Sequence, residues 1–277
     1  MGRIVVWMTH YLASGVIINI LIKRVYDRLF FVCQKSAIVV INMLFSIIIP
    51  AYNEGENLKV CIDSCKKQSG DFEYEIIVVD NNSVDNTFAV AESLGVKVFK
   101  QEKQGVGWAR RMAVENSRGD YIVSIDADTH LPENYLLETK KRFNKKKRLV
   151  CLGGQMFFYD GTWWQNILRA ILHWPLYWFA YIASRGKLGP MGNNMSFPRE
   201  LYDKVGGFDP KLKFGEDADL SAKLFKYGKV KLDMSLKCWV SARRFRPDNK
   251  GLWIYILNFV KLCVTGRPYK NELSSHI

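Results

Sequence analysis

The sequence predicts an α/β protein with a mostly parallel sheet and helices on both of its faces. Short apolar runs recur along the first half of the chain, at residues 44–50, 74–80, 96–99 and 121–125, and a helical pattern separates each run from the next. Strands that alternate with helices at this spacing are joined by right-handed crossovers and lie parallel in one sheet. We therefore expect a doubly wound sheet.

Polar loops follow three of these strands. They contain Tyr52, Asn53 and Glu54 after the first strand, Asp80, Asn81 and Asn82 after the second, and Asp126 and Asp128 after the strand at 121–125. Open α/β sheets bind ligands just beyond the carboxyl ends of their strands, where neighbouring strand ends share one crevice. We therefore expect the three loops to converge on one ligand.

Asp126 and Asp128 close a strand of four apolar residues and one Ser. Such a strand is typical of a parallel sheet that is buried on both sides. Side chains two positions apart on an extended segment point the same way, so both carboxylates can face one ligand. Hard divalent cations that also bind phosphates favour one or two carboxylates and several waters. An isolated Asp-x-Asp is more often a turn that caps the next helix, so the other motifs must decide between a metal site and a turn.

The formal net charge of +13 predicts an anionic partner: a membrane surface, a phosphorylated ligand or nucleic acid. No recognisable nucleic-acid-binding module accompanies the charge, so we expect no nucleic-acid partner. The Lys-rich run at 140–148 ends a predicted helix, and a solvated helix face is its simplest interpretation. The six cysteines show no CxxC pair or metal-finger spacing, which favours reduced, buried thiols in a cytosolic compartment.

The N-terminal segment, residues 1–42, contains an apolar stretch at 4–22 that is about long enough to span a bilayer. Basic residues are more numerous after this stretch than before it, which places the bulk of the protein in the cytoplasm. A second interpretation stays open. Met43 directly precedes the first strand, so the segment could be an upstream extension that the natural protein lacks.

Aromatic residues concentrate at 162–183. This density is typical of a membrane interface, a substrate groove or a core, and helical amphipathicity alone does not separate an interface from a core. A further amphipathic stretch at 252–264 is consistent with an interfacial helix. Together with the basic charge, these stretches predict a membrane-associated protein.

A second acidic cluster, Glu216, Asp217 and Asp219, lies where a helix that runs to Gly228 is expected to begin. Acidic side chains at a helix N-terminus stabilise the helix dipole, and this role requires no chemistry. A catalytic role for the cluster therefore needs support from the rest of the chain.

In combination, these segments resemble the family 2 glycosyltransferases of the GT-A fold. The resemblance covers roughly residues 44–242, and its ordered set of motifs is more specific than any single motif. The matching segments are 46–54, 78–87, Asp126-Ala-Asp128, Gly192-Asn193-Asn194, 206–209 and Gly215-Glu216-Asp217. The resemblance implies a catalytic domain at 43–245, with a donor half at 43–130 and an acceptor half at 131–245, followed by a C-terminal amphipathic helix and tail at 246–277.

The resemblance also implies an inverting hexosyltransferase with a nucleoside-diphosphate sugar donor, favouring UDP and allowing GDP. By motif position, the donor nucleotide would be bound by Pro50, Ala51, Tyr52, Glu54, Asp80, Arg110 and Asp126. Asp128, with Asp126, would bind Mg²⁺ or Mn²⁺ on the diphosphate as a DxD motif. Asp217 would be the general base, and Glu216 would help to orient the acceptor.

The chemistry of this reaction explains why two acidic sites are needed. Negative charge builds on the departing diphosphate, and a metal ion neutralises that charge. The sugar carbon becomes oxocarbenium-like while an acceptor hydroxyl attacks it, and that hydroxyl needs a base within hydrogen-bond reach. A binding module would have no use for the second acidic site.

The sequence departs from the family pattern near residues 239–246, where many relatives carry a late His or a Gln-x-x-Arg-Trp motif. Arg243 and Arg244 could bind the pyrophosphate in its place, with surface basicity as the alternative. Asn193 and Asn194 are further candidates for pyrophosphate or acceptor contacts. The missing motif favours a single addition over processive synthesis.

We therefore expect a metal-dependent transferase for cell-envelope biogenesis, with a lipid-linked or cell-envelope glycan acceptor. Two alternatives remain: a polyprenyl-phosphate sugar transferase, and a catalytically silent scaffold that binds nucleotide-sugar.

Overall fold

The computed structural model describes residues 43–212, 214–243 and 261. The predicted N-terminal apolar segment lies outside these residues, and so does the predicted C-terminal helix and tail apart from Lys261. Within the part of the chain that is described, no helix combines the length and the apolar character needed to cross a bilayer.

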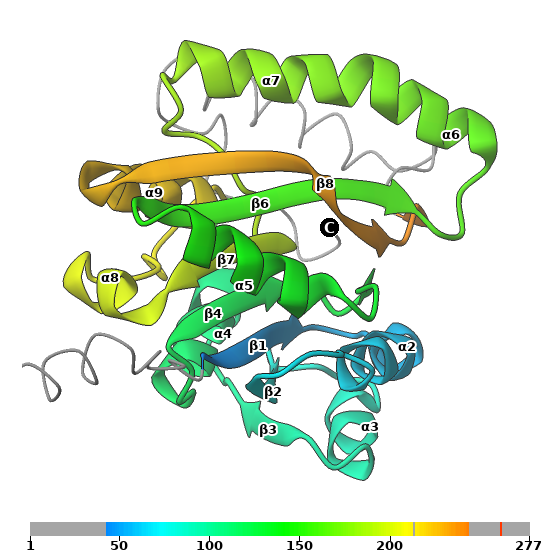
Figure 1. The fold of residues 1–277 in the computed structure, drawn as a ribbon. Coiled ribbons are helices and arrows are strands. Elements are labelled where there is room, and N and C mark those ends of the chain that lie inside the picture. The colour runs from blue at the N-terminus through cyan, green and yellow to red at the C-terminus, as the bar shows by residue number, and fades with distance from the viewer. Residues whose placement is uncertain (1–42, 213, 244–260, 262–277) are drawn as a thin grey trace, which may run out of the picture. The chain divides into compact units, whose positions relative to one another are not determined.

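The described chain forms one eight-stranded sheet with helices between most of its strands (Figure 1). The strands are β1 (Leu44–Ala51), β2 (Glu73–Asp80), β3 (Lys97–Lys100), β4 (Tyr121–Ile125), β5 (Thr129–His130), β6 (Leu149–Phe158), β7 (Asn194–Pro198) and β8 (Lys229–Val240). The helices are α2 (Gly55–Lys66), α3 (Thr87–Ser93), α4 (Val106–Glu115), α5 (Tyr135–Lys145), α6 (Trp163–Leu168), α7 (Trp174–Ala183), α8 (Arg199–Lys204) and α9 (Glu216–Leu224). A π-helical turn, η1 (Arg169–His173), joins α6 to α7, and a 3₁₀ turn, η2 (Phe225–Tyr227), follows α9.

The sheet is mixed: as expected, most of its strands run parallel, but β5 and β7 are reversed. Its strand order is β3-β2-β1-β4-β7-β6-β8-β5. The pairs β3–β2, β2–β1, β1–β4 and β6–β8 are parallel, whereas β7 runs antiparallel to both β4 and β6, and β5 runs antiparallel to β8. The sequence does not mark β7 as a strand, because it is short and lies among the turn residues of the Gly-Asn-Asn segment.

The predicted first half of the sheet is confirmed. Strand β1 is parallel to β2 and β4, and its residues are buried from Phe45 onward. Ile47 and Ile49 belong to one core cluster and Ile48 to another, so successive side chains of this strand pack on opposite faces of the sheet. Helices therefore cover both faces, as the continuous apolar runs predicted.

Helices α6 and α7, with η1 between them, form an arm that lies along β6 and β8 (Figure 1). Thr162 and Gln165 form a capping box at the start of α6. The Asn166 side chain exchanges hydrogen bonds of 2.9 and 3.2 Å with the backbone of Phe158 in β6. The Tyr181 hydroxyl donates to the carbonyl of Val230 in β8 at 2.8 Å. Both ends of the arm are therefore fastened to the sheet.

Candidate active site

The first two predicted donor loops lie side by side at one edge of the sheet. Ala51 at the end of β1 and Asp80 at the end of β2 are register partners, as are Pro50 and Val79. The backbone N–H of Asn81 donates to the carbonyl of Ala51 at 2.7 Å, so the two chains remain paired just past the strand ends. This arrangement confirms that neighbouring loops meet at the carboxyl edge.

Hydrogen bonds to Asp80 and Glu54 fix the shape of these loops. Asp80 is 1% exposed, and its Oδ1 accepts from the backbone N–H of Ser83 at 3.1 Å. The backbone N–H of Glu54 donates to Thr87 Oγ1 at 2.8 Å, and the Glu54 carboxylate accepts from Asn57 Nδ2 at 2.9 Å. Tyr52, in the loop after β1, is half-buried.

Arg110 is the residue that joins the two acidic motifs. It lies on α4, and its backbone and side chain are 4% exposed overall. Its Nη2 is 2.9 Å from Asp126 Oδ1, and its Nη1 forms an ion pair with Glu216 at the start of α9. One guanidinium thus connects the first carboxylate of the DxD motif to the second acidic cluster.

The charges around Arg110 determine its protonation and that of Glu216. Burial by itself lowers the pKa of Arg110, but the negative charges of Glu216, Asp126 and Asp217 outweigh it and raise the pKa. Burial also raises the pKa of Glu216, and the positive charge of Arg110 opposes that shift. Glu216 was predicted to orient the acceptor, a role that stays a prediction. The contact that the structure gives this buried side chain is with Arg110.

Gly192 explains how Arg110 fits between the motifs. A Cβ atom at Gly192 would lie 2.4 Å from the guanidinium carbon and nitrogens of Arg110, so only glycine permits this packing. The Ser124 hydroxyl donates to the Gly192 carbonyl at 2.8 Å, and the Gly192 N–H donates to Asp217 Oδ2 at 2.7 Å. Gly192 therefore links strand β4 to the predicted base.

Asp217 lies in the first turn of α9 and is partly exposed. Its second oxygen, Oδ1, accepts from the N–H of Ala218 at 2.7 Å. The residue before the helix is Gly215, which has no side chain to cap it, so the acidic cluster does not begin with a capping carboxylate. Two backbone donors thus fix the orientation of a carboxylate that solvent can reach.

Arg243, just beyond the end of β8, brings positive charge to the same edge. Its Nη2 forms an ion pair with Glu54, and its Nε is 3.6 Å from Asp128 Oδ2. Arg243 therefore lies beside Glu54 and Asp128, and its predicted contact with the pyrophosphate stays a prediction. Arg244, the other predicted pyrophosphate ligand, lies outside the described residues.

Asp126 and Asp128 fit a divalent cation that is shared with a diphosphate. Two carboxylates supply the hard oxygen donors that Mg²⁺ and Mn²⁺ take alongside phosphate oxygens and water. Among the residues with described positions, no group of three or more His, Cys, Asp or Glu side chains forms a complete protein cage. The donor set therefore suits a cation that the protein and a phosphorylated ligand hold together.

Asn193 and Asn194 differ in their surroundings. Asn194 is 1% exposed, its Oδ1 accepts from the Tyr135 hydroxyl at 2.5 Å, and its Nδ2 lies 3.2 Å from Cys238 Sγ. The predicted ligand contact of Asn194 stays a prediction, and both ends of its amide already have partners inside the protein. Asn193 Oδ1 is buried without a hydrogen-bond partner among the described groups, so Asn193 keeps an acceptor that a ligand hydroxyl could fill.

Several supporting contacts escaped prediction. Ser124 and Tyr135 hold the Gly-Asn-Asn segment from β4 and α5, and Asn81 Oδ1 accepts from the Gly105 N–H at 3.1 Å at the start of α4. These residues are far apart in sequence, and no local periodicity predicts their contacts. The sequence offered one signal of this supporting structure. The Gly-Asn-Asn motif marks position 192, where the packing against Arg110 requires glycine.

Comparison with known proteins gives a family for this arrangement. The model of Glycosyl transferase family 2 matches residues 46–206. A curated relative from Methanococcus voltae, dolichyl N-acetyl-alpha-D-glucosaminyl phosphate 3-beta-D-2,3-diacetamido-2,3-dideoxy-beta-D-glucuronosyltransferase, is 25% identical over 203 residues, or 66% of this chain and 62% of that protein. The chain spans 30% and 19% of the length of two longer curated relatives.

Two solved structures have a similar fold. The mannosyltransferase PcManGT of Pyrobaculum calidifontis, in complex with GDP-Man and Mn²⁺, has a TM-score of 0.63 and 18% identity, covering 81% of this chain and 64% of that chain. The glucosyl-3-phosphoglycerate synthase of Mycobacterium tuberculosis, in complex with Mn²⁺ and UDP-glucose, has a TM-score of 0.58 and 20% identity, covering 82% and 80%. The fold is therefore GT-A-like, and the family match covers more than half of the chain. The chain belongs to glycosyl transferase family 2.

Proposed function

We propose that this chain is a glycosyltransferase that moves one sugar, with inversion, from a nucleoside-diphosphate donor to a lipid-linked or cell-envelope glycan acceptor, and that it requires a divalent metal ion. The observation that carries the proposal is the buried Arg110 bridge between Asp126 and Glu216. It sets the distance between a carboxylate suited to the donor and an acidic cluster suited to the acceptor.

On the donor side, the loops after β1 and β2 would bind the nucleotide through Pro50, Ala51, Tyr52, Glu54 and Asp80. The pairing of Ala51 with Asp80 and their hydrogen-bonded loops support a preformed nucleotide site. Asp126 and Asp128 would hold Mg²⁺ or Mn²⁺, and that ion would supply Lewis-acid neutralisation of the leaving diphosphate. Arg243 would add a charge-assisted contact to the same phosphates.

On the acceptor side, Asp217 would accept the proton of the attacking hydroxyl. Its partial exposure and the two backbone donors that fix its orientation support this role. A general base must lie within hydrogen-bond reach of the hydroxyl that it deprotonates. Asn193 Oδ1 would accept a hydrogen bond from the acceptor, since it lacks one among the described groups.

The proposal also covers the nucleotide base of the donor and the location of the enzyme in the cell. A uridine donor is our expectation, with guanosine as the alternative, and the two neighbouring structures were solved with one donor of each kind. We place the enzyme at a membrane, with its catalytic domain in the cytoplasm. The net charge of +13 and the exposed aromatic side chains of the arm support a membrane surface as partner.

A second candidate is a polyprenyl-phosphate sugar transferase. A phosphate acceptor is already ionised and needs little base catalysis, so Asp217→Asn would then have a mild effect. A third candidate, from another class, is a scaffold that binds nucleotide-sugar without turnover.

The first test is a thermal-shift comparison of UDP, GDP, dTDP and CMP, each with Mn²⁺, Mg²⁺ or a chelator. A ligand at about a hundred times its dissociation constant stabilises the fold by about 2.7 kcal/mol, which shifts the unfolding midpoint measurably. We expect one diphosphate to stabilise the protein, and chelation or Asp128→Ala to abolish the effect. Stabilisation that survives both changes would argue against the metal site. Binding without transfer of a radiolabelled sugar to membrane acceptors would favour the scaffold.

A further inference from the structure

A pocket of about 410 Å³ lies at the other edge of the sheet from the candidate active site. Leu149 and Lys229, the first residues of the parallel strands β6 and β8, are register partners and line the pocket. The pocket therefore lies where these two strands begin. Strand β6 runs in the same direction as β4, since both are antiparallel to β7. The start of β6 is therefore remote from the end of β4, where Asp126 lies.

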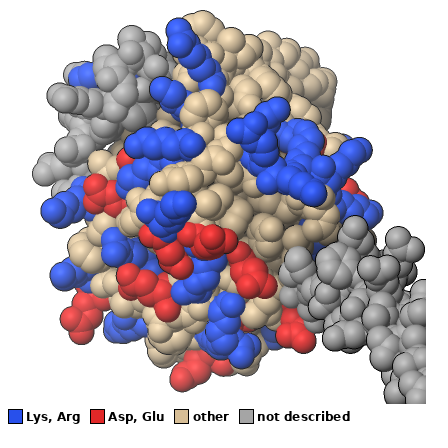
Figure 2. All heavy atoms as spheres, turned by 60° about the vertical axis from the view of Figure 1, so that its left-hand side comes forward, with Lys and Arg blue, Asp and Glu red and all other residues tan. Residues whose placement is uncertain are grey.

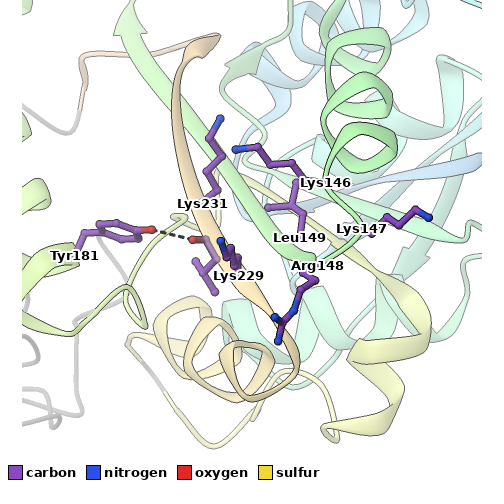
Figure 3. A pocket seen from close by; sticks show the side chains of 8 residues that line it. Lys146, Lys147, Arg148, Leu149, Tyr181, Lys229 and Lys231 are labelled. Carbon is purple, nitrogen blue, oxygen red and sulfur yellow. Dashed lines mark hydrogen bonds between the residues drawn. The ribbon is translucent and has the colours of Figure 1, made fainter.

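Basic side chains dominate this pocket, which we call the basic pocket: Lys146, Lys147, Arg148, Lys229 and Lys231. Lys146 and Lys231 point to the same side in Figure 3, whereas Lys147 points away. The positive charge of Lys231 lowers the pKa of Lys146. Asp233 pairs with Lys231, but it also pairs with Arg142 at 2.9 Å, so this one carboxylate does not balance the cluster.

An exposed apolar stripe runs along the arm beside the basic pocket. It consists of side chains three or four positions apart, all of them exposed: Trp164, Ile167, Ile171, Pro175, Phe179 and Ile182. Ile171, Phe179 and Ile182 are 61%, 62% and 69% exposed. Spacing of this kind places the side chains on one face of a helix. A row of large apolar side chains exposed in this way indicates an interaction site.

Tyr181 connects the stripe to the basic pocket. It lines the pocket and donates its hydrogen bond to Val230, and the next residue on α7 is Ile182 of the stripe. Two exposed basic residues, Arg185 and Lys187, follow directly after α7. Figure 2 brings the left-hand side of Figure 1 forward. In this view the blue Lys and Arg side chains predominate in the upper half, and the red carboxylates lie mostly in the lower half.

We propose that the stripe and the basic pocket together form a docking surface for a bilayer that contains anionic phospholipids. The stripe enters the headgroup region, and the basic pocket with Arg185 and Lys187 binds lipid phosphates. Charge complementarity selects this partner: apolar burial alone gives weak interfacial binding, and nearby Lys and Arg residues add attraction to anionic lipids. This surface does not depend on the proposed reaction and uses none of its candidate residues.

The test compares binding of the full chain to vesicles of phosphatidylcholine alone and of phosphatidylcholine mixed with phosphatidylglycerol. Sedimentation gives the ratio of the two affinities, and hydrogen–deuterium exchange reports protection of residues 163–183. Residues 1–42 are present in the wild type and in every variant, so their contribution is the same in each comparison between variants. We expect preference for the anionic vesicles, loss of that preference at high salt, and protection of 163–183 by anionic vesicles.

The informative variant replaces Lys146, Lys229 and Lys231 by Gln, and its matched control replaces the exposed Lys59, Lys67 and Lys100 by Gln. Each lysine near an anionic surface contributes about fivefold in affinity, so the triple variant should lose roughly a hundredfold while the control stays near wild type. Phe179→Ser with Ile182→Ser should weaken binding and protection as well. Unchanged unfolding midpoints establish that each variant is folded, and Lys146→Gln with Lys229→Gln serves if the triple variant is unstable.

Three outcomes would overturn the proposal. The first is equal affinity for neutral and anionic vesicles with equal protection of 163–183. The second is a lysine triple variant that keeps the anionic preference of the control. The third is protection of the starts of β6 and β8 by inorganic phosphate with no effect of vesicles on the arm, which would assign the basic pocket to a soluble anion.

Discussion

Arg110 and Glu216 form a buried ion pair although they are 106 residues apart in the chain. Arg110 comes from α4 in the donor half, and Glu216 begins α9 in the acceptor half. The same guanidinium is held by Asp126 within the donor half, so a shift of one half against the other would break the buried contact with Glu216. The pair therefore sets the spacing of the site more firmly than either loop does alone.

Replacing Arg110 by Met should destabilise the protein by about 3–5 kcal/mol, because Asp126 and Glu216 would lose their buried counter-charge. Urea unfolding measures the loss. The control is Arg111→Met on the same helix, whose surface ion pair with Glu115 contributes about 0–1 kcal/mol. A double variant with Glu216→Leu should be less unstable than the sum of the single changes. Additive losses would mean that the two residues are not coupled.

Asp217→Asn should lower turnover by a factor of about 10²–10⁴, because the amide cannot take up the acceptor's proton. The amide oxygen can still accept the hydrogen bond from Gly192, so the unfolding midpoint and donor affinity should stay close to wild type. Asp219→Asn on the same helix is the control, since Asp219 pairs with Lys223 at 2.7 Å. Equal turnover of the two variants would remove Asp217 from the role of base.

Arg243→Gln should weaken diphosphate binding by roughly tenfold or more, because one charge-assisted hydrogen bond contributes about 1.5–3 kcal/mol. Titration calorimetry with the stabilising nucleoside diphosphate, and with the matching nucleoside, separates a phosphate contact from a base contact. We expect the loss for the diphosphate only. A similar loss for the nucleoside would indicate that Arg243 acts by holding the Glu54 loop through its ion pair.

The stability that ionised Glu75 contributes to the fold should be lost in acid. Burial alone would raise the pKa of Glu75, but hydrogen bonds from Lys97, Ser46 and the Arg118 backbone outweigh it and lower the pKa from 4.5 to about 2. A folded-state pKa below the unfolded one means that the ionised carboxylate stabilises the fold above about pH 4.5 and that this stability disappears as the pH falls toward 2.

The contribution of Glu75 at neutral pH is at most about 3 kcal/mol. Unfolding free energies of wild type and Glu75→Gln, measured between neutral pH and pH 2, should differ at neutral pH and converge in acid. Glu92→Gln, at an exposed position on α3, is the control and should follow wild type throughout. A constant difference between wild type and Glu75→Gln across this range would contradict the prediction.

The first half of the fold was predictable because its information is local. The apolar runs that became β1, β2 and β4 are continuous, and their polar loops follow directly. The reversed strand β7 was not predictable, since its direction depends on pairing with β4 and β6, which are distant in the sequence. Local pattern also gave no sign that Arg110 pairs with Glu216, whereas the contact of Arg110 with the donor nucleotide stays a prediction.

The aromatic stretch shows the same limit. Its helical spacing was evident, but the division between Trp178 and Tyr181, which pack against Leu232, and Phe179, which is exposed, depends on which face of α7 meets β8. The sequence shows that the apolar residues recur at helical spacing, but only the packing shows which face of the helix meets the sheet.

The reversal of β7 has a consequence for how this chain could diversify. Because Asn194, the first residue of β7, pairs with Ile125, the last residue of β4, the chain between Phe158 and Asn194 returns to the sheet at the edge that carries Asp126. Substitutions or insertions in that connection can remodel what approaches the reaction edge while β1 to β4 keep their pairing. Replacing the connection between Phe158 and Asn194 by the corresponding segment of a relative would therefore change one side of the site and leave the other side intact.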